Sequence, residues 1–163
     1  GGMPLRGVLD TVSEFRQNDQ QTPIVLMGYL NPVIAMGEVA FCDACQASGV
    51  DGLLIVDMPP EEEDSLVRAA KIRNLDLIYL AAPTTTDARL ATIGQSTSGY
   101  LYYVSLKGIT GSSKLDTADV KERIEHIRQH VSVPSVWASV FAPLRMRPLF
   151  LLPPMEVLWG PFL

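Results

Sequence analysis

Four short apolar segments, each followed by a segment with helical character, constrain the fold of this chain more than any other feature. Charged residues are rare in these segments, as is typical of parallel strands buried on both faces. The segments cover residues 24–29, 52–57, 75–82 and 100–105. Because parallel strands need crossover connections, the alternation predicts an α/β fold built from β/α units. Periodicity alone leaves both a TIM (β/α)8 barrel and a doubly wound sheet open.

The segments between the strands carry signals for helix termini. Gly49 follows one periodic segment and favours the end of a helix, and Pro59-Pro60 before the carboxylates 61–64 favours the start of another. If the fold is a barrel, about four β/α units make half of one, with exposed edges at 24–29 and 100–104. The other predicted helices cover residues 5–18, 33–48, 89–95 and 116–130, and a loop with a helix N-cap is predicted at 83–87.

Composition narrows the class of protein. The chain is 47% hydrophobic and 19% charged, which fits strands buried on both faces. A net charge of −5 with scattered basic residues argues against a nucleic-acid partner. No apolar run is long enough to span a membrane, and residues 1–7 resemble neither a signal peptide nor a transit sequence. Two cysteines make no disulfide framework, so we expect a cytoplasmic protein.

The most informative loop covers residues 107–113, directly after the predicted strand at 100–105. Gly108 and Gly111 allow the backbone to approach a ligand closely, and Thr110 adds a hydroxyl group and an N–H. In β/α folds the active site lies at the carboxyl ends of the strands. The sequence therefore predicts a ligand-binding loop here.

Four motifs in chain order resemble the alpha subunit of tryptophan synthase. They are TPIVLMGYLNPV (22–33), GVDGLLIVDMPPEE (49–62), LIYLAAPTTTD (77–87) and GYLYYVSLKGITG (99–111). The resemblance covers roughly residues 1–134 and implies a partial TIM barrel of about four β/α units. That family cleaves indole-3-glycerol phosphate into indole and glyceraldehyde 3-phosphate. The resemblance thus implies a lyase of tryptophan biosynthesis with a beta-subunit partner, which holds the pyridoxal phosphate, so no cofactor is expected on this chain.

The resemblance also implies roles for individual residues. Taken alone, Tyr102 reads as a core residue, because alternation places Tyr100 and Tyr102 on one face of the strand and Tyr103 on the other. In the family, the matching tyrosine lies beside the substrate, and a mobile loop closes over the phosphate. The substrate-binding residues that the resemblance implies are Tyr102, Thr110 and Gly111, and the residues at the beta-subunit interface are Asn31, Asp57 and Pro59. Leu106 departs from the arginine that some members carry there.

The resemblance places the family's catalytic carboxylates outside the matched segment. The acid–base glutamate ends barrel strand two, and the aspartate that binds the indole N–H follows in the next loop. Both precede the segment that this chain matches, so no catalytic residue is assigned. We therefore expect the chain as given to be inactive, because it lacks the carboxylate that protonates the indole ring carbon.

Residues 135–163 depart from the family pattern. The family continues with a strand and a Gly-Phe-Gly phosphate turn, whereas this segment contains five prolines and no clear periodicity. In an offset reading frame, Trp137-Ala138 forces a glycine codon, and residues 135–142 can encode Gly-Val-Gly-Phe-Gly-Ile-Arg. We therefore predict a partial barrel over residues 1–134 and an aberrant, frameshifted tail over 135–163.

Two pairs of residues with metal-ligand spacing are assigned structural roles. Cys42 and Cys45 lie within a predicted helix and lack a second cysteine pair. His126 and His130 have the i, i+4 spacing that can bind zinc, but no HExxH pattern accompanies them. Their place near a helix C-terminus suits the helix dipole. No metal site is predicted.

Two alternatives to a lyase subunit remain open. One is another phosphate-binding β/α-barrel enzyme of tryptophan or histidine biosynthesis, and the other is a non-catalytic remnant that only binds the beta subunit. The segments Asp57-Met58-Pro59-Pro60 and 107–111 favour the tryptophan synthase family over the first. Binding of the beta subunit without lyase turnover would identify the second.

Overall fold

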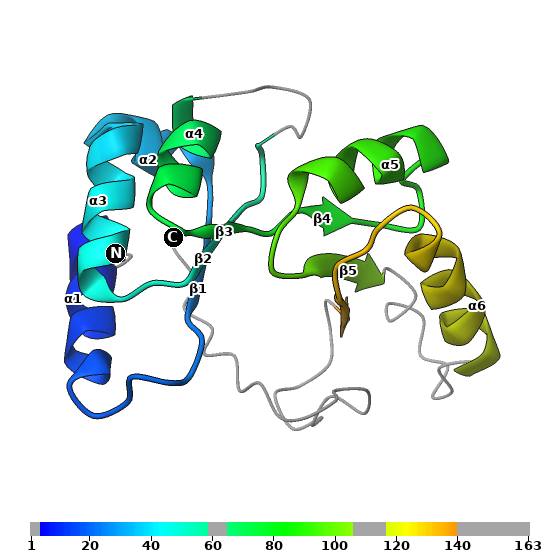
Figure 1. Ribbon diagram of the computed structural model, residues 1–163, viewed down its shortest axis with the longest axis horizontal. Helices are drawn as coiled ribbons and strands as arrows, with labels where there is room; N and C mark the ends of the chain where they lie inside the picture. The colour runs from blue at the N-terminus through cyan, green and yellow to red at the C-terminus, as the bar shows by residue number, and fades with distance from the viewer. Residues whose placement is uncertain (1–3, 59–64, 106–116, 140–163) are drawn as a thin grey trace. The chain divides into compact units, whose positions relative to one another are not determined.

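The computed structural model describes residues 4–58, 65–105 and 117–139 of the chain, which form two compact units (Figure 1). Of the described residues, those up to Ile78 belong to the first unit and those from Tyr79 onward belong to the second. The elements are α1 (Leu5–Arg16), β1 (Val25–Gly28), α2 (Leu30–Met36), α3 (Glu38–Ser48), β2 (Gly52–Ile55), α4 (Ser65–Ile72), β3 (Asp76–Leu77), β4 (Leu80–Ala81), α5 (Asp87–Ser96), β5 (Leu101–Ser105), α6 (Thr117–Arg128) and β6 (Ser135–Ser139). Among the described residues, no helix combines the length and apolar character needed to cross a bilayer.

The first unit is a parallel sheet with helices packed beside it. Its strand order is β1-β2-β3, and β2 is buried along its whole length. Leu53 and Leu54 on this strand have no exposed surface, which places the centre of the core at β2. Figure 1 shows α1 and α3 side by side along these strands. Strands buried in this way require the continuous apolar runs that the sequence contains.

Arg16 at the end of α1 holds the starts of two strands together. Its Nε donates to the Gly49 carbonyl oxygen at 2.8 Å, and one Nη donates to the Thr22 carbonyl oxygen at 2.7 Å. The other Nη pairs with Asp51 Oδ2 at 2.7 Å. That carboxylate also accepts the Ile24 N–H at 2.7 Å. The guanidinium group therefore satisfies carbonyl groups at a helix end and fixes the entry into the sheet.

Two predicted elements are each divided in the structure. The predicted helix at 33–48 consists of α2 and α3, because Gly37 has φ 88° and ψ 123°, outside the helical region. Its predicted end at Gly49 is confirmed by a left-handed φ of 88°. The predicted strand at 75–82 consists of β3 and β4. Between them, the Ile78 N–H donates to the Leu53 carbonyl oxygen in the first unit. The Tyr79 carbonyl oxygen accepts from the Tyr102 N–H in the second unit.

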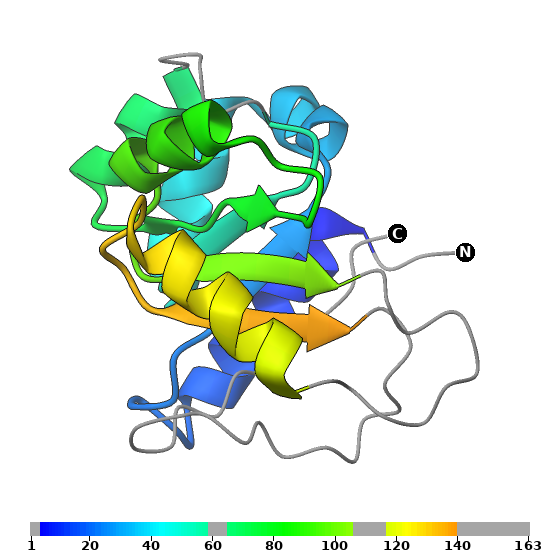
Figure 2. The ribbon, with the colours of Figure 1, turned by 90° about the vertical axis from the view of Figure 1, so that its right-hand side faces the viewer.

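The second unit is a parallel sheet with strand order β4-β5-β6. Its buried side chains include Leu90 and Ile93 of α5, Leu101 of β5 and Ile127 of α6. Figure 2 looks onto α6, with β5 and β6 behind it. The Thr86 side chain accepts the Arg89 N–H at 3.4 Å, as expected for the predicted helix N-cap. The N-cap Thr86, directly before α5, thus satisfies one of the N–H groups of the first helical turn.

Strand β6 corrects one sequence prediction. It pairs with β5 over five residues, from Leu101 opposite Ser135 to Ser105 opposite Ser139. The prediction that residues 100–104 form an edge is therefore wrong, because β5 has neighbours on both sides, whereas β1 is an edge of the sheet described. The prolines of the tail begin at Pro143, so the five residues 135–139 can form a strand. Regular structure thus continues past the predicted boundary at 134, and residues 140–163 lie outside the described part.

Candidate substrate and partner sites

The predicted substrate residue Tyr102 lies on the central strand of the second unit. Tyr103 is 3% exposed and Tyr100 is 8% exposed, whereas Tyr102 is half-buried. Neighbouring residues of a strand point to opposite faces, so Tyr100 and Tyr102 share the face that Tyr103 does not occupy. The Tyr100 hydroxyl is buried and has no hydrogen-bond partner among the described residues.

The environment of both tyrosines keeps their phenol groups neutral. Burial raises the pKa of Tyr100 to about 12, and the nearby Tyr102 adds to this rise. Burial also raises the pKa of Tyr102 above its ordinary value. A neutral phenol donates and accepts hydrogen bonds but is a poor base at neutral pH. This face of β5 can therefore bind and orient a polar molecule, and proton transfer needs other groups.

The predicted interface residues of the first unit lie on two loops that are joined by hydrogen bonds. The Leu30 N–H at the start of α2 donates to Asp57 Oδ1 at 2.8 Å, and the Val56 N–H donates to the Gly28 carbonyl oxygen at 2.9 Å. Asn31 and Asp57 are both exposed. The structure thus brings these two segments together, although 27 residues separate Leu30 from Asp57.

Apolar side chains next to these residues are also exposed. Tyr29 is 55% exposed, Ile34 is 56% exposed and Val56 is 37% exposed. Single exposed apolar residues are common on protein surfaces, so they permit an interface here but do not by themselves identify one. We call Tyr29, Asn31, Ile34, Val56 and Asp57 the α2 surface.

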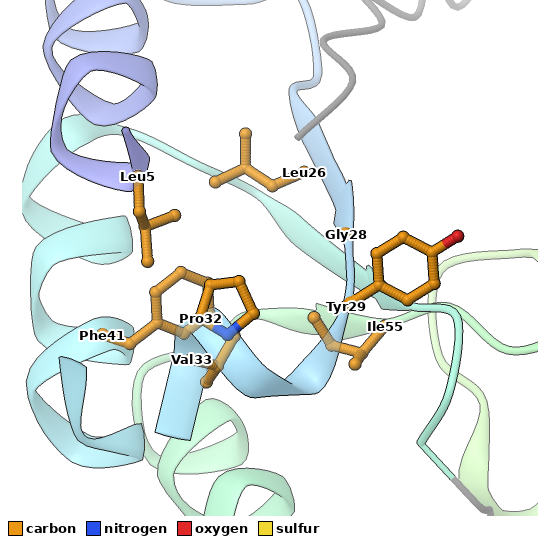
Figure 3. Close-up of a pocket in the computed structure, with 8 residues that line it drawn as sticks. All are labelled: Leu5, Leu26, Gly28, Tyr29, Pro32, Val33, Phe41 and Ile55. Carbon is orange, nitrogen blue, oxygen red and sulfur yellow. The ribbon is translucent and has the colours of Figure 1, made fainter. Parts of the chain in front are cut away.

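A small apolar pocket of the first unit lies beside β1 (Figure 3). Its volume is about 10 Å³, which is close to the minimum for one water molecule. The pocket is therefore a gap in packing and is too small for a metabolite. The residues that line it are Leu5, Leu26, Gly28, Tyr29, Pro32, Val33, Phe41 and Ile55.

Three predicted site residues lie outside the described residues. They are Pro59, Thr110 and Gly111, together with the rest of the loop at 107–113. Their predicted roles stay predictions.

The cysteine pair lies in the core of the first unit, within α3. Cys42 and Cys45 have no exposed surface. Burial raises the pKa of Cys42 to about 11 and raises the pKa of Cys45 further. Protonated, inaccessible thiols are poor nucleophiles and poor metal ligands. The pair packs as ordinary apolar side chains, as the sequence indicated.

Comparison with known proteins establishes the family. The sequence model described as "Tryptophan synthase alpha chain" matches residues 1–138. The alpha chain of Laribacter hongkongensis is 51% identical over 133 residues, which are 82% of this chain and 50% of that protein. The chain of Aromatoleum aromaticum is 55% identical over 133 residues, which are 82% of this chain and 49% of that protein. This chain therefore spans about half the length of these relatives.

Solved structures agree with the sequence comparison. The Legionella pneumophila alpha chain has a TM-score of 0.72 and 38% identity, covering 83% of this chain and 49% of that one. A chain of the α2β2 tryptophan synthase complex of Pyrococcus furiosus has a TM-score of 0.75 and 34% identity, and the match covers 84% of this chain and 55% of that one. These matches confirm the predicted fold, a partial β/α barrel with parallel strands. The chain belongs to the tryptophan synthase alpha chain family.

Proposed function

We propose that this chain forms one side of the substrate site of a tryptophan synthase alpha subunit. The proposed reaction is cleavage of indole-3-glycerol phosphate into indole and glyceraldehyde 3-phosphate. The observation that carries the proposal is the position of Tyr102, half-buried on β5 within the segment that matches the family. The buried Tyr100 hydroxyl on the same face supports it, because that group has no partner among the described residues and suits a polar ligand atom.

The proposed reaction breaks the carbon–carbon bond between the indole ring and the glycerol phosphate chain. The ring carbon gains a proton, and the adjacent hydroxyl of the chain loses one as it becomes the aldehyde. Tyr102 is neutral because burial raises its pKa, so its proposed role is to bind and orient the substrate. Thr110 and Gly111 are proposed to close over the phosphate through the loop that follows β5.

The proposal can be tested in a chimaera in which residues 1–134 replace the matching segment of the Laribacter hongkongensis alpha chain. We expect Tyr102→Phe and Thr110→Val each to lower kcat/KM about fivefold, since one hydroxyl contact contributes about 1 kcal/mol. The measurement is the rate of indole release at several substrate concentrations. Tyr103→Phe is the matched control and is expected to leave the rate unchanged, because Tyr103 lies on the opposite face of β5. Unchanged kinetics in Tyr102→Phe would identify Tyr102 as a core residue.

The proposed partner is a tryptophan synthase beta subunit, bound through Asn31, Asp57 and Pro59. Two observations support this interface. Asp57 holds the start of α2 through the Leu30 N–H, which keeps Asn31 beside it. The exposed apolar residues of the α2 surface lie within three positions of Asn31 or Asp57 in the chain. The similar Pyrococcus furiosus chain belongs to a structure described as an α2β2 complex.

The interface can be tested with Asp57→Ala in the same chimaera. Removing the carboxylate frees the Leu30 N–H and loosens the start of α2. We expect the Kd for the Laribacter hongkongensis beta subunit, measured by calorimetry, to rise at least about tenfold, as for an interface hot spot. Asp10→Ala removes an exposed carboxylate from α1 and is expected to leave the Kd unchanged. Equal affinity of Asp57→Ala and the parent would refute the assignment.

The proposal assigns no cofactor to this chain and places the protein in the cytoplasm. Pyridoxal phosphate is assigned to the beta subunit, and the alpha family is consistent with needing no cofactor of its own. The cytoplasmic setting is supported by two free, buried cysteines, which suit a reducing compartment.

A further inference from the structure

Three potential metal ligands come together on the second unit, away from Tyr102 in the sequence. His126 Nε2 lies 2.9 Å from Asp87 Oδ1, and the rings of His126 and His130 have centroids 5.2 Å apart. One ligand atom from each of Asp87, His126 and His130 lies within 4.8 Å of the other two. The sequence contains two histidines, and both are in this cluster.

The fold holds each of these residues in place through the backbone. Helix α6 ends in a turn in which the N–H groups of His130 and Val131 both donate to the Ile127 carbonyl oxygen at 2.9 Å. This turn keeps His130 about one helical turn beyond His126. Asp87 is the first residue of α5 and follows the N-cap Thr86. The three side chains therefore come from two helix termini with defined backbone geometry.

Close packing between α5 and the end of α6 fixes the distance between them. A Cβ atom added at Gly94 of α5 would collide with the carbonyl oxygen of His130. The two backbones are therefore in contact at this point, which only glycine allows. Such contact limits how far Asp87 and the histidines can separate, because both are tied to the same helix pair.

We propose that Asp87, His126 and His130 bind a divalent transition-metal ion such as Zn²⁺. Two imidazoles and one carboxylate are a donor set that zinc sites use, with water as the fourth ligand. The Asp87 side chain is 65% exposed and that of His126 is 38% exposed, so an ion has direct access from solvent. This site is independent of the proposed lyase function, and the spacing of the histidines alone could not reveal it, because Asp87 is 39 residues from His126.

Small side-chain movements bring the three donors into coordination geometry. With zinc–ligand bonds of about 2.1 Å, tetrahedral donors lie about 3.4 Å apart. The hydrogen-bonded pair at 2.9 Å must therefore open slightly, and the widest separation, within 4.8 Å, must shorten. Exposed and half-buried side chains can make such movements by rotation. The ion would take the place of the hydrogen bond between His126 and Asp87.

The proposal can be tested by titrating the 163-residue chain, purified without a histidine tag, with ZnCl₂ in a calorimeter. We expect one Zn²⁺ per chain. We expect the affinity for Zn²⁺ to fall more than about tenfold in each of three variants, Asp87→Asn, His126→Gln and His130→Gln. Loss of a residue that only hydrogen-bonds to a metal ligand already lowers metal affinity about 10–100-fold. Asp43→Asn is the matched control: it removes an exposed carboxylate that pairs with Arg73 at 2.6 Å in the first unit, and it should bind as the parent does.

Two further measurements distinguish binding at this site from binding through the cysteines or elsewhere on the chain. Zn²⁺ is expected to raise the Tm of the parent and of Asp43→Asn but not that of Asp87→Asn, because an ion that binds the folded state stabilises it. Co²⁺ is expected to give a spectrum without a thiolate charge-transfer band, since Cys42 and Cys45 are buried. The proposal is wrong if Asp87→Asn binds Zn²⁺ as tightly as the parent, if a thiolate band appears, or if binding does not saturate at one ion. In those cases the cluster is a hydrogen bond between His126 and Asp87 with His130 beside it.

Discussion

The polypeptide of residues 1–163 is expected to release no measurable indole from indole-3-glycerol phosphate, whereas the chimaera that contains residues 1–134 is expected to release it. From the family resemblance we predict that the acid–base carboxylate lies outside the segment that this chain matches. General acid–base catalysis contributes about 10²–10⁴-fold to a rate, so its loss is expected to lower turnover by about that factor, towards the rate of the protein-free blank. The described face of β5 provides tyrosines whose pKa is raised by burial, and neutral phenols are poor bases at neutral pH.

The measurement is indole release at saturating substrate, with the intact Laribacter hongkongensis chain as a positive control and a protein-free blank. Indole above the blank from residues 1–163 would show that a carboxylate within this segment supports the chemistry. A folded but inactive chimaera would instead count against the proposed substrate site. The two results therefore test different parts of the proposal.

Gly94→Val is expected to lower the free energy of unfolding of this chain by about 3 kcal/mol, near the upper end of the cost of overpacking. The new Cβ would collide with the backbone carbonyl of His130, which cannot rotate away as a side chain does. Helix α5 must then shift, and the packing of Leu90 and Ile93 is disturbed. Helix propensity alone predicts the opposite sign, because valine is a better helix former than glycine.

The matched control is Gln95→Val, which introduces the same side chain at the next, exposed position of α5. We expect this variant to change the free energy of unfolding by less than about 0.5 kcal/mol. Both variants are compared with the parent in urea denaturation followed by circular dichroism. Equal stability of Gly94→Val and the parent would show that α5 does not approach the His130 carbonyl so closely.

The pattern of elements was accessible from the sequence because its signals act over a few residues. Apolar runs marked β1, β2 and β5, and Gly49 marked the end of α3. The same local signals did not predict where a strand is interrupted, because the interruption depends on hydrogen bonds to other segments of the chain. The predicted strand at 75–82 divides because Ile78 and Tyr79 bond to different strands. The strand at 135–139 was missed because a proline-rich segment follows it, while each of its residues pairs with a β5 residue 34 positions earlier in the chain.

The sequence by itself determined the family, the β/α order and the residue types at the proposed sites, because these depend on local patterns and on motifs. Only the tertiary structure decided which of those residues meet. It placed the Leu30 N–H within hydrogen-bonding distance of Asp57, which is 27 residues later in the chain. It also placed Asp87 beside His126, which is 39 residues later. The physical reason is that such contacts depend on how helices pack and where strands end. Helical or strand periodicity does not encode those distances.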